Sequence, residues 1–317
     1  MIPFDPARSQ LLVPPPSDGP GSWAGAPGAF RDGGELFVCY RLRRPAPVRG
    51  HELRIAAVER GALRDLWTVR KDDLRAESIE RAAIVRHERA WRLYVSYVAE
   101  MDRQWRIGLV EAESIESLDA RTIRTILHPS ATGTLAVKDP WIVRERGRWR
   151  MFVSCGRRVE DPHVDSRGDA LSSGATKSET GLAESDDGVE WSWLGIVFGA
   201  SERGWDRFTA RLTCATRDAG GWLGCYDGSA SLDENYEERC GLARSPNLLS
   251  WQRVSVDGPV IGTPRGAGGV RCERVGHQVD VREAIERKAR PRRHRPRQPA
   301  KDAADEANRR ERHHRVA

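Results

Sequence analysis

Alternating apolar and polar positions form a short motif that recurs four times along the chain. Its clearest copy covers residues 137–155, VKDPWIVRERGRWRMFVSC, where an apolar strand and an alternating strand flank a charged turn. This pattern predicts a β-hairpin whose first strand opens with an Asp-Pro pair, Asp139 and Pro140. The other copies cover residues 26–40, 79–97 and, more loosely, 210–226. Their starts lie roughly 55 to 70 residues apart, an interval typical of propeller blades.

A second motif lies between the hairpins. Residues 181–191 (GLAESDDGVEW) and 241–251 (GLARSPNLLSW) share Gly, Leu, Ala, Ser and Trp, and residues 55–67 and 107–118 resemble them more loosely. Each repeat therefore predicts a hairpin followed by two further strands, which together make one blade of an antiparallel propeller. A β-sandwich also consists of short strands and turns, but nothing requires it to repeat at this interval. We expect an all-β, five-bladed β-propeller with four recognisable blades.

The repeating pattern ends after Trp251. A fifth blade would begin near Pro264, yet the last 66 residues contain no Phe, Trp or Tyr, so this blade is degenerate or incomplete. Residues 282–317 contain 13 Lys and Arg but 6 Asp and Glu, a balance of +7, so the rest of the chain carries −1 of the total +6. Such a segment cannot offset its ordering entropy by burial. We expect an extended arm at residues 1–22, a propeller at 23–281 and a disordered basic tail at 282–317.

Composition narrows the class of protein. No apolar run approaches the roughly 18 residues of a membrane span, and the N-terminus lacks the pattern of a secretory signal, so we expect a cytoplasmic protein. The six cysteines show no CxxC or Cys/His spacing, which predicts buried thiols and no metal or cofactor. Because the basic charge lies in the tail, it would attract nucleic acid only without sequence specificity, and we expect no such partner for the propeller.

Charged residues occupy equivalent places in successive blades. Glu80 and Asp139 both lie at the first strand of their blades, so their side chains are expected to face one central axis. Arg211 is expected at the axial position of the fourth blade. Arg41, beside an aromatic residue, is either a ligand for an anion or a sugar hydroxyl, or a solvated strand end. Other candidate site residues, at or near the blade mouths, are Trp23, Arg81, Asp227, Tyr236 and Glu237.

These motifs resemble those of the five-bladed β-propeller glycosidases, a group that includes arabinanases, xylosidases, invertase-like fructosidases and mannoside phosphorylases. The resemblance covers about residues 23–260 and rests on KDP at 138–140, IER at 79–81, the hairpins that follow, and the GLAxS…W phrases. KDP is similar to the RDP of the fructosidases, whose aspartate supports the transition state. IER is similar to the acidic motifs of the second blade in these enzymes.

The first blade departs from the pattern. Many of these enzymes open it with Asp-Pro, whose aspartate is the nucleophile or base, whereas this chain has Ala26-Pro27. Either another carboxylate has taken over this role, or the propeller binds sugar without cleaving it. The resemblance thus implies a glycoside-acting enzyme, a hydrolase or a phosphorylase, with a carbohydrate as its substrate. A non-catalytic carbohydrate-binding propeller is the alternative.

Glycoside cleavage needs a protonated acid for the leaving oxygen and an ionised carboxylate as base or nucleophile. We assign these tasks to Asp139, Glu80 and Glu237. Neighbouring cations such as Arg81 and Arg211 would hold adjacent carboxylates ionised. The expected substrate-binding residues are Trp23, Arg41, Arg81, Arg211, Asp227 and Tyr236, of which Trp23 or Tyr236 could stack on a sugar face.

Overall fold

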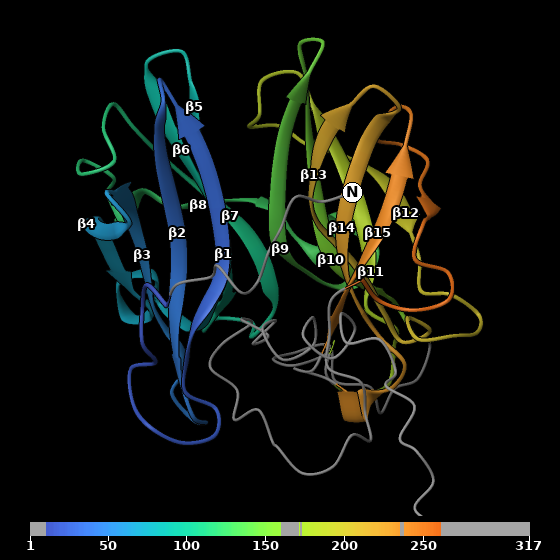
Figure 1. The fold of residues 1–317 in the computed structure, drawn as a ribbon. Helices are drawn as coiled ribbons and strands as arrows, with labels where there is room; N and C mark the ends of the chain where they lie inside the picture. The colour runs from blue at the N-terminus through green and yellow to red at the C-terminus, as the bar shows by residue number, and fades with distance from the viewer. Residues whose placement is uncertain (1–10, 160–170, 172, 235–237, 261–317) are drawn as a thin grey trace, which may run out of the picture. The chain divides into compact units, whose positions relative to one another are not determined.

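The computed structural model describes residues 11–159, 171, 173–234 and 238–260, which form a nearly all-β structure. Their strands make four antiparallel sheets of four strands each (Figure 1). The first sheet consists of β1 (Trp23–Asp32), β2 (Glu35–Arg44), β3 (Arg49–Glu59) and β4 (Ala62–Arg70). The second consists of β5 (Ala76–His87), β6 (Ala90–Ala99), β7 (Trp105–Ala112) and β8 (Arg124–Leu127).

The third sheet consists of β9 (Thr134–Glu145), β10 (Arg148–Arg157), β11 (Glu179–Ser185) and β12 (Ser192–Phe198). The fourth consists of β13 (Thr209–Asp218), β14 (Gly221–Ser229), β15 (Arg239–Ser245) and β16 (Gln252–Arg253). The helical elements of the described residues are short: η2 (Lys71–Leu74), η3 (Ala120–Thr122), α1 (Pro129–Thr132) and η5 (Leu232–Glu234). None of these helices is long and apolar enough to cross a membrane.

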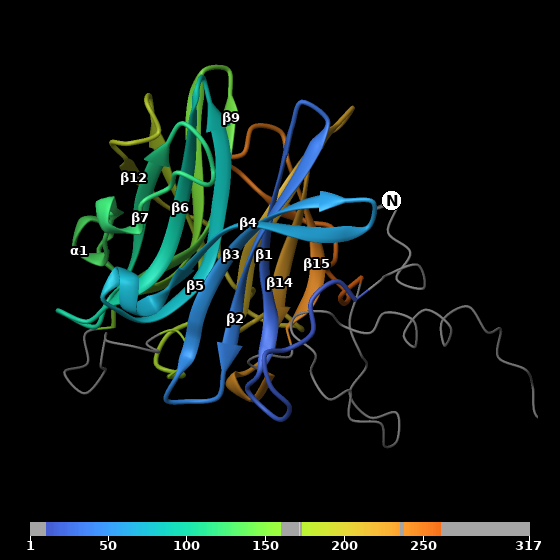
Figure 2. The same cartoon turned by 90° about the vertical axis from the view of Figure 1, so that its left-hand side faces the viewer.

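Each sheet is a simple meander whose strands pair in chain order. The first strands of successive sheets contact one another, β1 with β5, β5 with β9, and β9 with β13. Figure 2 shows β5, β6 and β7 running beside β9. This is the arrangement of propeller blades, in which the first strand of each blade is the innermost. The predicted propeller with four recognisable blades is therefore confirmed, and the sandwich alternative is wrong.

Apolar side chains fill the space between neighbouring blades. Ile55 of the first blade and Leu93 of the second belong to one buried cluster. Leu109 of the second blade and Met151 of the third belong to another. A third cluster joins Phe152 and Leu182 of the third blade to Leu212 and Tyr226 of the fourth. The alternation of apolar residues along each strand thus supplies both faces of every inner blade with packing surface.

The residues of the GLAESDDGVEW motif form a capped turn between β11 and β12. The Ser185 hydroxyl accepts hydrogen bonds from the backbone N–H groups of Asp187 and Gly188, at 3.2 and 2.8 Å. The Asp187 carboxylate accepts from the next two backbone N–H groups, at 2.8 and 2.9 Å. Finally, the Trp191 indole donates to the carbonyl of Gly188 at 3.2 Å. The turn therefore satisfies its own backbone and anchors the tryptophan.

The same turn recurs between β15 and β16. The Ser245 hydroxyl accepts from the N–H groups of Asn247 and Leu248, at 3.3 and 2.8 Å. Asn247 Oδ1 accepts from the following two N–H groups, at 2.9 and 3.1 Å, and Trp251 donates to the Leu248 carbonyl at 3.2 Å. The repeated Ser and Trp of the two phrases are thus the residues that close each turn.

Replacing Ser185 with alanine should lower the free energy of unfolding by about 1 kcal/mol, because the N–H groups of Asp187 and Gly188 lose their acceptor. Urea denaturation measures the change. Ser192→Ala, at an exposed position of β12, is the matched control and should have no effect. Equal midpoints for the two variants would show that the turn does not depend on its hydroxyl cap.

The structure corrects the predicted start of the third hairpin. The sequence placed Asp139 and Pro140 at the opening of a strand that begins at Trp141, whereas β9 begins at Thr134 and contains both residues. Proline is tolerated there because the pair lies at a β-bulge, where one ladder hydrogen bond is lost in any case. The residues expected to form the fifth blade and the tail lie outside the described residues. The proposed domain boundaries remain predictions.

Candidate functional site

Three blades carry a β-bulge at the same point of their first strand. Two residues of the bulged strand stand opposite one residue of the partner strand in β1, β5 and β9. The bulged pairs are Ala26-Pro27, Glu80-Arg81 and Asp139-Pro140. Ala26 and Asp139 have positive φ angles of 51° and 57°, which aspartate tolerates better than alanine. A bulge re-aims the side chains of the inner strand, and this is how Glu80 and Asp139 reach one cluster.

The fourth blade departs from this pattern. The register of β13 shifts between Leu212 and Cys214, so the extra residue is Thr213. The sequence placed Arg211 at the axial position, but Arg211 precedes the bulge by two residues. Its guanidinium nevertheless acts on the Asp139 carboxylate, whose pKa it lowers. Arg211 therefore acts on Asp139 from a different strand position than expected.

Glu80 is ion-paired with Arg41 of the neighbouring blade. The two residues are 8% and 2% exposed, so the pair is almost wholly buried. Arg41 is thus no solvated strand end, which was one of the two possibilities left open by the sequence. Because a buried charge needs a partner of opposite sign, the first and second blades are joined by this pair.

Asp139 is held from both its backbone and its side chain. Its N–H donates to the hydroxyl of Ser96 in β6 at 2.8 Å. Its carboxylate lies 3.5 Å from the ammonium group of Lys138, and these two side chains are 18% and 15% exposed. The Lys138 ammonium also lies 5.2 Å from the ring centroid of Trp105, within the range of a cation–π contact.

The surrounding cations keep Asp139 ionised. Burial alone would raise the pKa of its carboxyl group, but Lys138, Arg211, Arg41 and Arg81 together hold it below the usual range. Burial would likewise lower the pKa of Lys138, but Asp139 and Glu80 raise it above the usual range. Both carboxylates therefore interact electrostatically with the Lys138 ammonium group, so Glu80 and Asp139 belong to one charged cluster.

Arg81 and Arg211 complete this cluster. It is called the axial cluster below and consists of Arg41, Glu80, Arg81, Lys138, Asp139 and Arg211. Arg81 Nη2 donates to the backbone carbonyl of Thr213 at 2.9 Å and so connects the second blade to the fourth. Arg211 Nη2 lies 2.6 Å from the carboxylate of Glu238. Burial would lower the pKa of Arg211, but Glu238, Asp227 and Asp139 raise it. Asp227 also faces Arg211 in the register of β13 and β14.

Glu238 is a site residue that sequence reasoning missed. Its side chain is 3% exposed and paired with Arg211. The sequence favoured its neighbour Glu237, which lies outside the described residues together with Tyr236. In the run NYEE of residues 235–238, alternation along a strand would bring only one of the two glutamates to a given face. The strand β15, however, begins only at Arg239, so this signal was not readable from the sequence.

Buried donors of the axial cluster point to a ligand rich in oxygen. The Nε–H groups of Arg41, Arg81 and Arg211 are buried and have no hydrogen-bond acceptor within the described residues. A buried donor without an acceptor costs about 1–3 kcal/mol. Hydroxyl or anionic oxygens of a bound molecule would satisfy these three donors.

Trp23 does not present a free aromatic face. It is buried, and the guanidinium groups of Arg43 and Arg41 lie 4.4 and 5.8 Å from its ring centroid. The sequence offered Trp23 or Tyr236 as the residue that could stack on a sugar. In this structure the Trp23 ring packs against the arginines, and Tyr236 lies outside the described residues. It positions Arg41 and Arg43 and does not offer a platform to a ligand.

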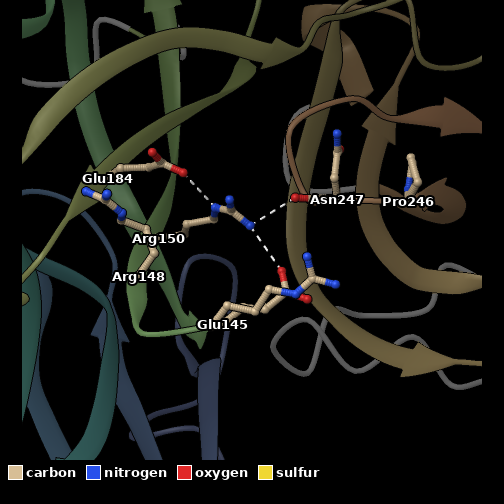
Figure 3. Close-up of a pocket in the computed structure, with 7 residues that line it drawn as sticks. Glu145, Arg148, Arg150, Glu184, Pro246 and Asn247 are labelled. Carbon is tan, nitrogen blue, oxygen red and sulfur yellow. Dashed lines mark hydrogen bonds and ion pairs between the residues drawn. The ribbon is translucent and has the colours of Figure 1, made fainter.

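A shallow pocket of about 200 Å³ lies away from the axial cluster, between the β9–β10 turn and the loop after β15 (Figure 3). Its central residue is Arg150, which lies 3.1 Å from Glu145 and 2.8 Å from Glu184 and donates to the Asn247 carbonyl at 2.9 Å. Glu145 follows Asp139 by six residues along β9, or about 20 Å at 3.3 Å per residue. Because its charges pair with one another, this pocket serves to join the third and fourth blades.

The described residues contain no group of three or more His, Cys, Asp and Glu side chains placed to hold a metal ion. The axial cluster is instead an alternation of cations and carboxylates. Its charged side chains are largely buried. In such a site each charge acts more strongly than it would in water.

The charge of Asp139 should make stability depend on acid pH. Its pKa is lower in the folded state than the value of about 4 in an unfolded chain. Its stabilising contribution is therefore fully present above about pH 4 and is lost as the pH falls through the folded-state value. Denaturation between pH 3 and pH 6 should show the difference between the natural protein and Asp139→Asn shrinking toward the acid end. A constant difference would contradict the depressed pKa.

Known structures share this fold. A glycoside hydrolase is 15% identical with a TM-score of 0.57, and the match covers 81% of this chain and 79% of the other. A thermostable family-43 glycoside hydrolase is 12% identical with a TM-score of 0.56, covering 80% and 78%. A structure described under the GH130 family of mannoside phosphorylases, with hydrolases that target β-1,2-mannosidic linkages in Candida mannan, is 14% identical with a TM-score of 0.52, covering 75% and 71%.

No protein-family model matches the chain. No curated protein matches its sequence either. At identities of 12 to 15%, the structural matches establish a common fold. The resemblance drawn from the KDP, IER and GLAxS motifs is thus confirmed at this level: the chain has the fold of the glycoside hydrolase-like β-propellers.

Proposed function

We propose that this protein is a glycoside-acting enzyme whose reaction takes place at the axial cluster. The observation that carries the proposal is the convergence of Glu80 and Asp139 on Lys138, from equivalent bulges of two successive blades. The structures that share this fold include glycoside hydrolases and mannoside phosphorylases. A carbohydrate is accordingly the proposed substrate.

Asp139 is suited to the task of an ionised carboxylate. Its neighbouring cations keep it charged at neutral pH, so it can stabilise the positive charge that develops on the sugar ring in an oxocarbenium-like transition state. It is not suited to the task of the acid, which must hold a proton. Glu80 and Glu237 remain the proposed partners for the acid and base steps.

The arginines are suited to hold the substrate. The buried Nε–H groups of Arg41, Arg81 and Arg211 have no acceptor within the described residues, and sugar hydroxyls would provide acceptors. The same N–H groups would also donate hydrogen bonds to an oxygen of inorganic phosphate, which is the attacking group in phosphorolysis. Hydrolysis and phosphorolysis are therefore both within the proposed class, and the attacking molecule distinguishes them.

A panel of aryl-glycosides, assayed with and without inorganic phosphate, tests the proposal. We expect release of the aryl group from at least one sugar, and a dependence on phosphate would identify a phosphorylase. Glu145→Gln is the matched control, because Glu145 lies on the same strand as Asp139 but pairs with Arg150 away from the axial cluster. Its activity should equal that of the natural protein. Absence of turnover across the panel would contradict the proposal that the protein is a glycoside-acting enzyme.

The second candidate is a carbohydrate-binding propeller without catalysis. Two observations favour it: Ala26 occupies the bulge of the first blade, and Glu80 is ion-paired with Arg41. Calorimetric titration with the same sugars separates the two candidates. Binding without turnover, at equal affinity in the natural protein and Glu145→Gln, would identify a binding protein.

A further inference from the structure

Three cysteines lie on one face of the fourth blade. Cys214 of β13 and Cys225 of β14 stand directly opposite each other in the antiparallel register. Cys240 of β15 stands opposite Asp227, two residues beyond Cys225 on the same face. All three are free thiols, and Cys214 is exposed whereas the other two are half-buried.

These thiols differ from the remaining cysteines of the described residues. The sequence predicted buried thiols throughout, which holds for Cys39 and Cys155 but is wrong for Cys214. Tyr226, next to Cys225, points to the opposite face and packs in the cluster with the third blade. The three cysteines therefore face away from that cluster, on the same side of the sheet as Asp227.

Spacing singles out one pair of the three. Directly opposed residues of antiparallel strands have Cα atoms about 4.5–5.5 Å apart, within the range of about 4.4–6.8 Å that a disulfide requires. Cys225 and Cys240 are diagonal neighbours, for which the separation is about 7–8 Å. Of the two pairs, only Cys214 and Cys225 thus lie within the Cα separation that a disulfide requires.

Each thiol of this pair shifts the pKa of the other. Cys225 raises the pKa of Cys214 beyond its usual range, and burial adds to this effect. Cys214 in turn lowers the pKa of Cys225, whereas Cys240 and burial raise it, to about 11 in balance. The raised pKa values keep both thiols protonated at neutral pH.

The pair borders the axial cluster through Thr213, which precedes Cys214. The Thr213 carbonyl accepts the hydrogen bond from Arg81 at 2.9 Å, and its hydroxyl donates to the Cys225 carbonyl at 3.2 Å. Thr213 is the extra residue of the β13 bulge. Drawing Cys214 toward Cys225 would change the backbone at this bulge and shift the acceptor of Arg81.

We propose that Cys214 and Cys225 form a reversible disulfide that controls the position of Arg81 in the axial cluster. The bond joins the two strands beside the bulge, and the displaced Thr213 carbonyl releases the guanidinium. The effect on substrate rests on the function proposed above, whereas the disulfide itself does not.

The oxidant is a small disulfide such as glutathione disulfide. The exposed Cys214 loses its proton and attacks one sulfur of the oxidant, so that a mixed disulfide forms and one glutathione leaves as a thiolate. Cys225 then loses its proton and attacks the Cys214 sulfur, which forms the Cys214–Cys225 bond and releases the second glutathione. Two protons and two electrons pass from the cysteines to the oxidant, and dithiothreitol reverses the reaction.

Peptide mapping of the full chain tests the bond. After treatment with glutathione disulfide and alkylation of the remaining thiols, trypsin places the three cysteines in separate peptides, residues 212–217, 218–239 and 240–244. We expect 212–217 to be linked to 218–239, in the natural protein and in Cys240→Ser but not in Cys225→Ser. A link between 218–239 and 240–244, a link to any other cysteine, or no link would overturn the proposal.

Two further measurements test the control of Arg81. Amide hydrogen exchange over residues 76–81 should rise on oxidation, and affinity for a responsive sugar should fall at least about tenfold. Cys225→Ser should show neither change. Unchanged exchange in a protein that carries the bond would overturn the link to Arg81. A reduced protein that neither binds nor cleaves any sugar would instead refute the proposed function and leave the peptide map and the exchange result as they stand.

Discussion

Asp139→Asn is expected to lower kcat/KM on a responsive glycoside by at least about 100-fold. The variant keeps the shape of the side chain but removes the charge that would stabilise an oxocarbenium-like transition state, and loss of one such group typically costs 10²–10³ in rate. Steady-state kinetics measures the effect, with Glu145→Gln as the control on the same strand. Equal kcat/KM values for the two variants would show that the reaction does not depend on the charge of Asp139.

The structure adds a stability effect to this prediction. The Asp139 side chain is only 18% exposed and lies beside Lys138. Asp139→Asn should therefore also destabilise the fold by on the order of 3 kcal/mol, because it leaves a buried cation without its partner. The double variant Lys138→Met/Asp139→Asn separates the two effects. It should regain stability without regaining activity.

Repetition explains why much of the fold could be predicted from the sequence. The hairpin pattern at residues 79–97 and 137–155 reflects the inner two strands of consecutive blades, whose alternating side chains pack on both neighbours. The GLAESDDGVEW phrase reflects a turn in which Ser185 and Trp191 have fixed partners. Both are local consequences of sequence, and local patterns repeat when the structure repeats.

The site was predictable only where it follows the repeat. Glu80 and Asp139 occupy equivalent bulges, so their convergence could be anticipated. The fourth blade has a shorter bulge at Thr213, and no sequence signal shows that one residue is missing there. Arg211 therefore reaches the axial cluster from a strand position that the repeat does not indicate.

Ion pairs and hydrogen bonds between blades could not be predicted from the sequence either. Arg41 and Glu80 are 39 residues apart, and Arg81 and Thr213 are 132 residues apart. Whether an arginine is solvated or buried in an ion pair depends on which strand comes to lie beside it. This is decided by the packing of whole blades, and no local pattern encodes it.

Arg41→Met should lower the free energy of unfolding by about 3 kcal/mol, because it leaves the Glu80 carboxylate buried without its partner. In a protein of this size such a loss corresponds to a decrease in Tm of roughly 6–12 °C. The double variant Arg41→Met/Glu80→Met should recover most of the loss, because two apolar side chains replace two charges that had to leave water. Thermal denaturation of the natural protein, both single variants and the double variant measures the coupling between the two residues.

The control for this cycle is a second Arg–Glu pair with similar geometry but no burial. Arg64 lies 2.7 Å from Glu59 at the turn between β3 and β4, and their side chains are 57% and 53% exposed. Water already solvates both charges there, so Arg64→Met should leave the Tm unchanged within error. If Arg41→Met proves as harmless as Arg64→Met, Glu80 is not held in a buried ion pair. Its carboxylate would then be free for the acid or base step, and the case for an enzyme over a binding protein would strengthen.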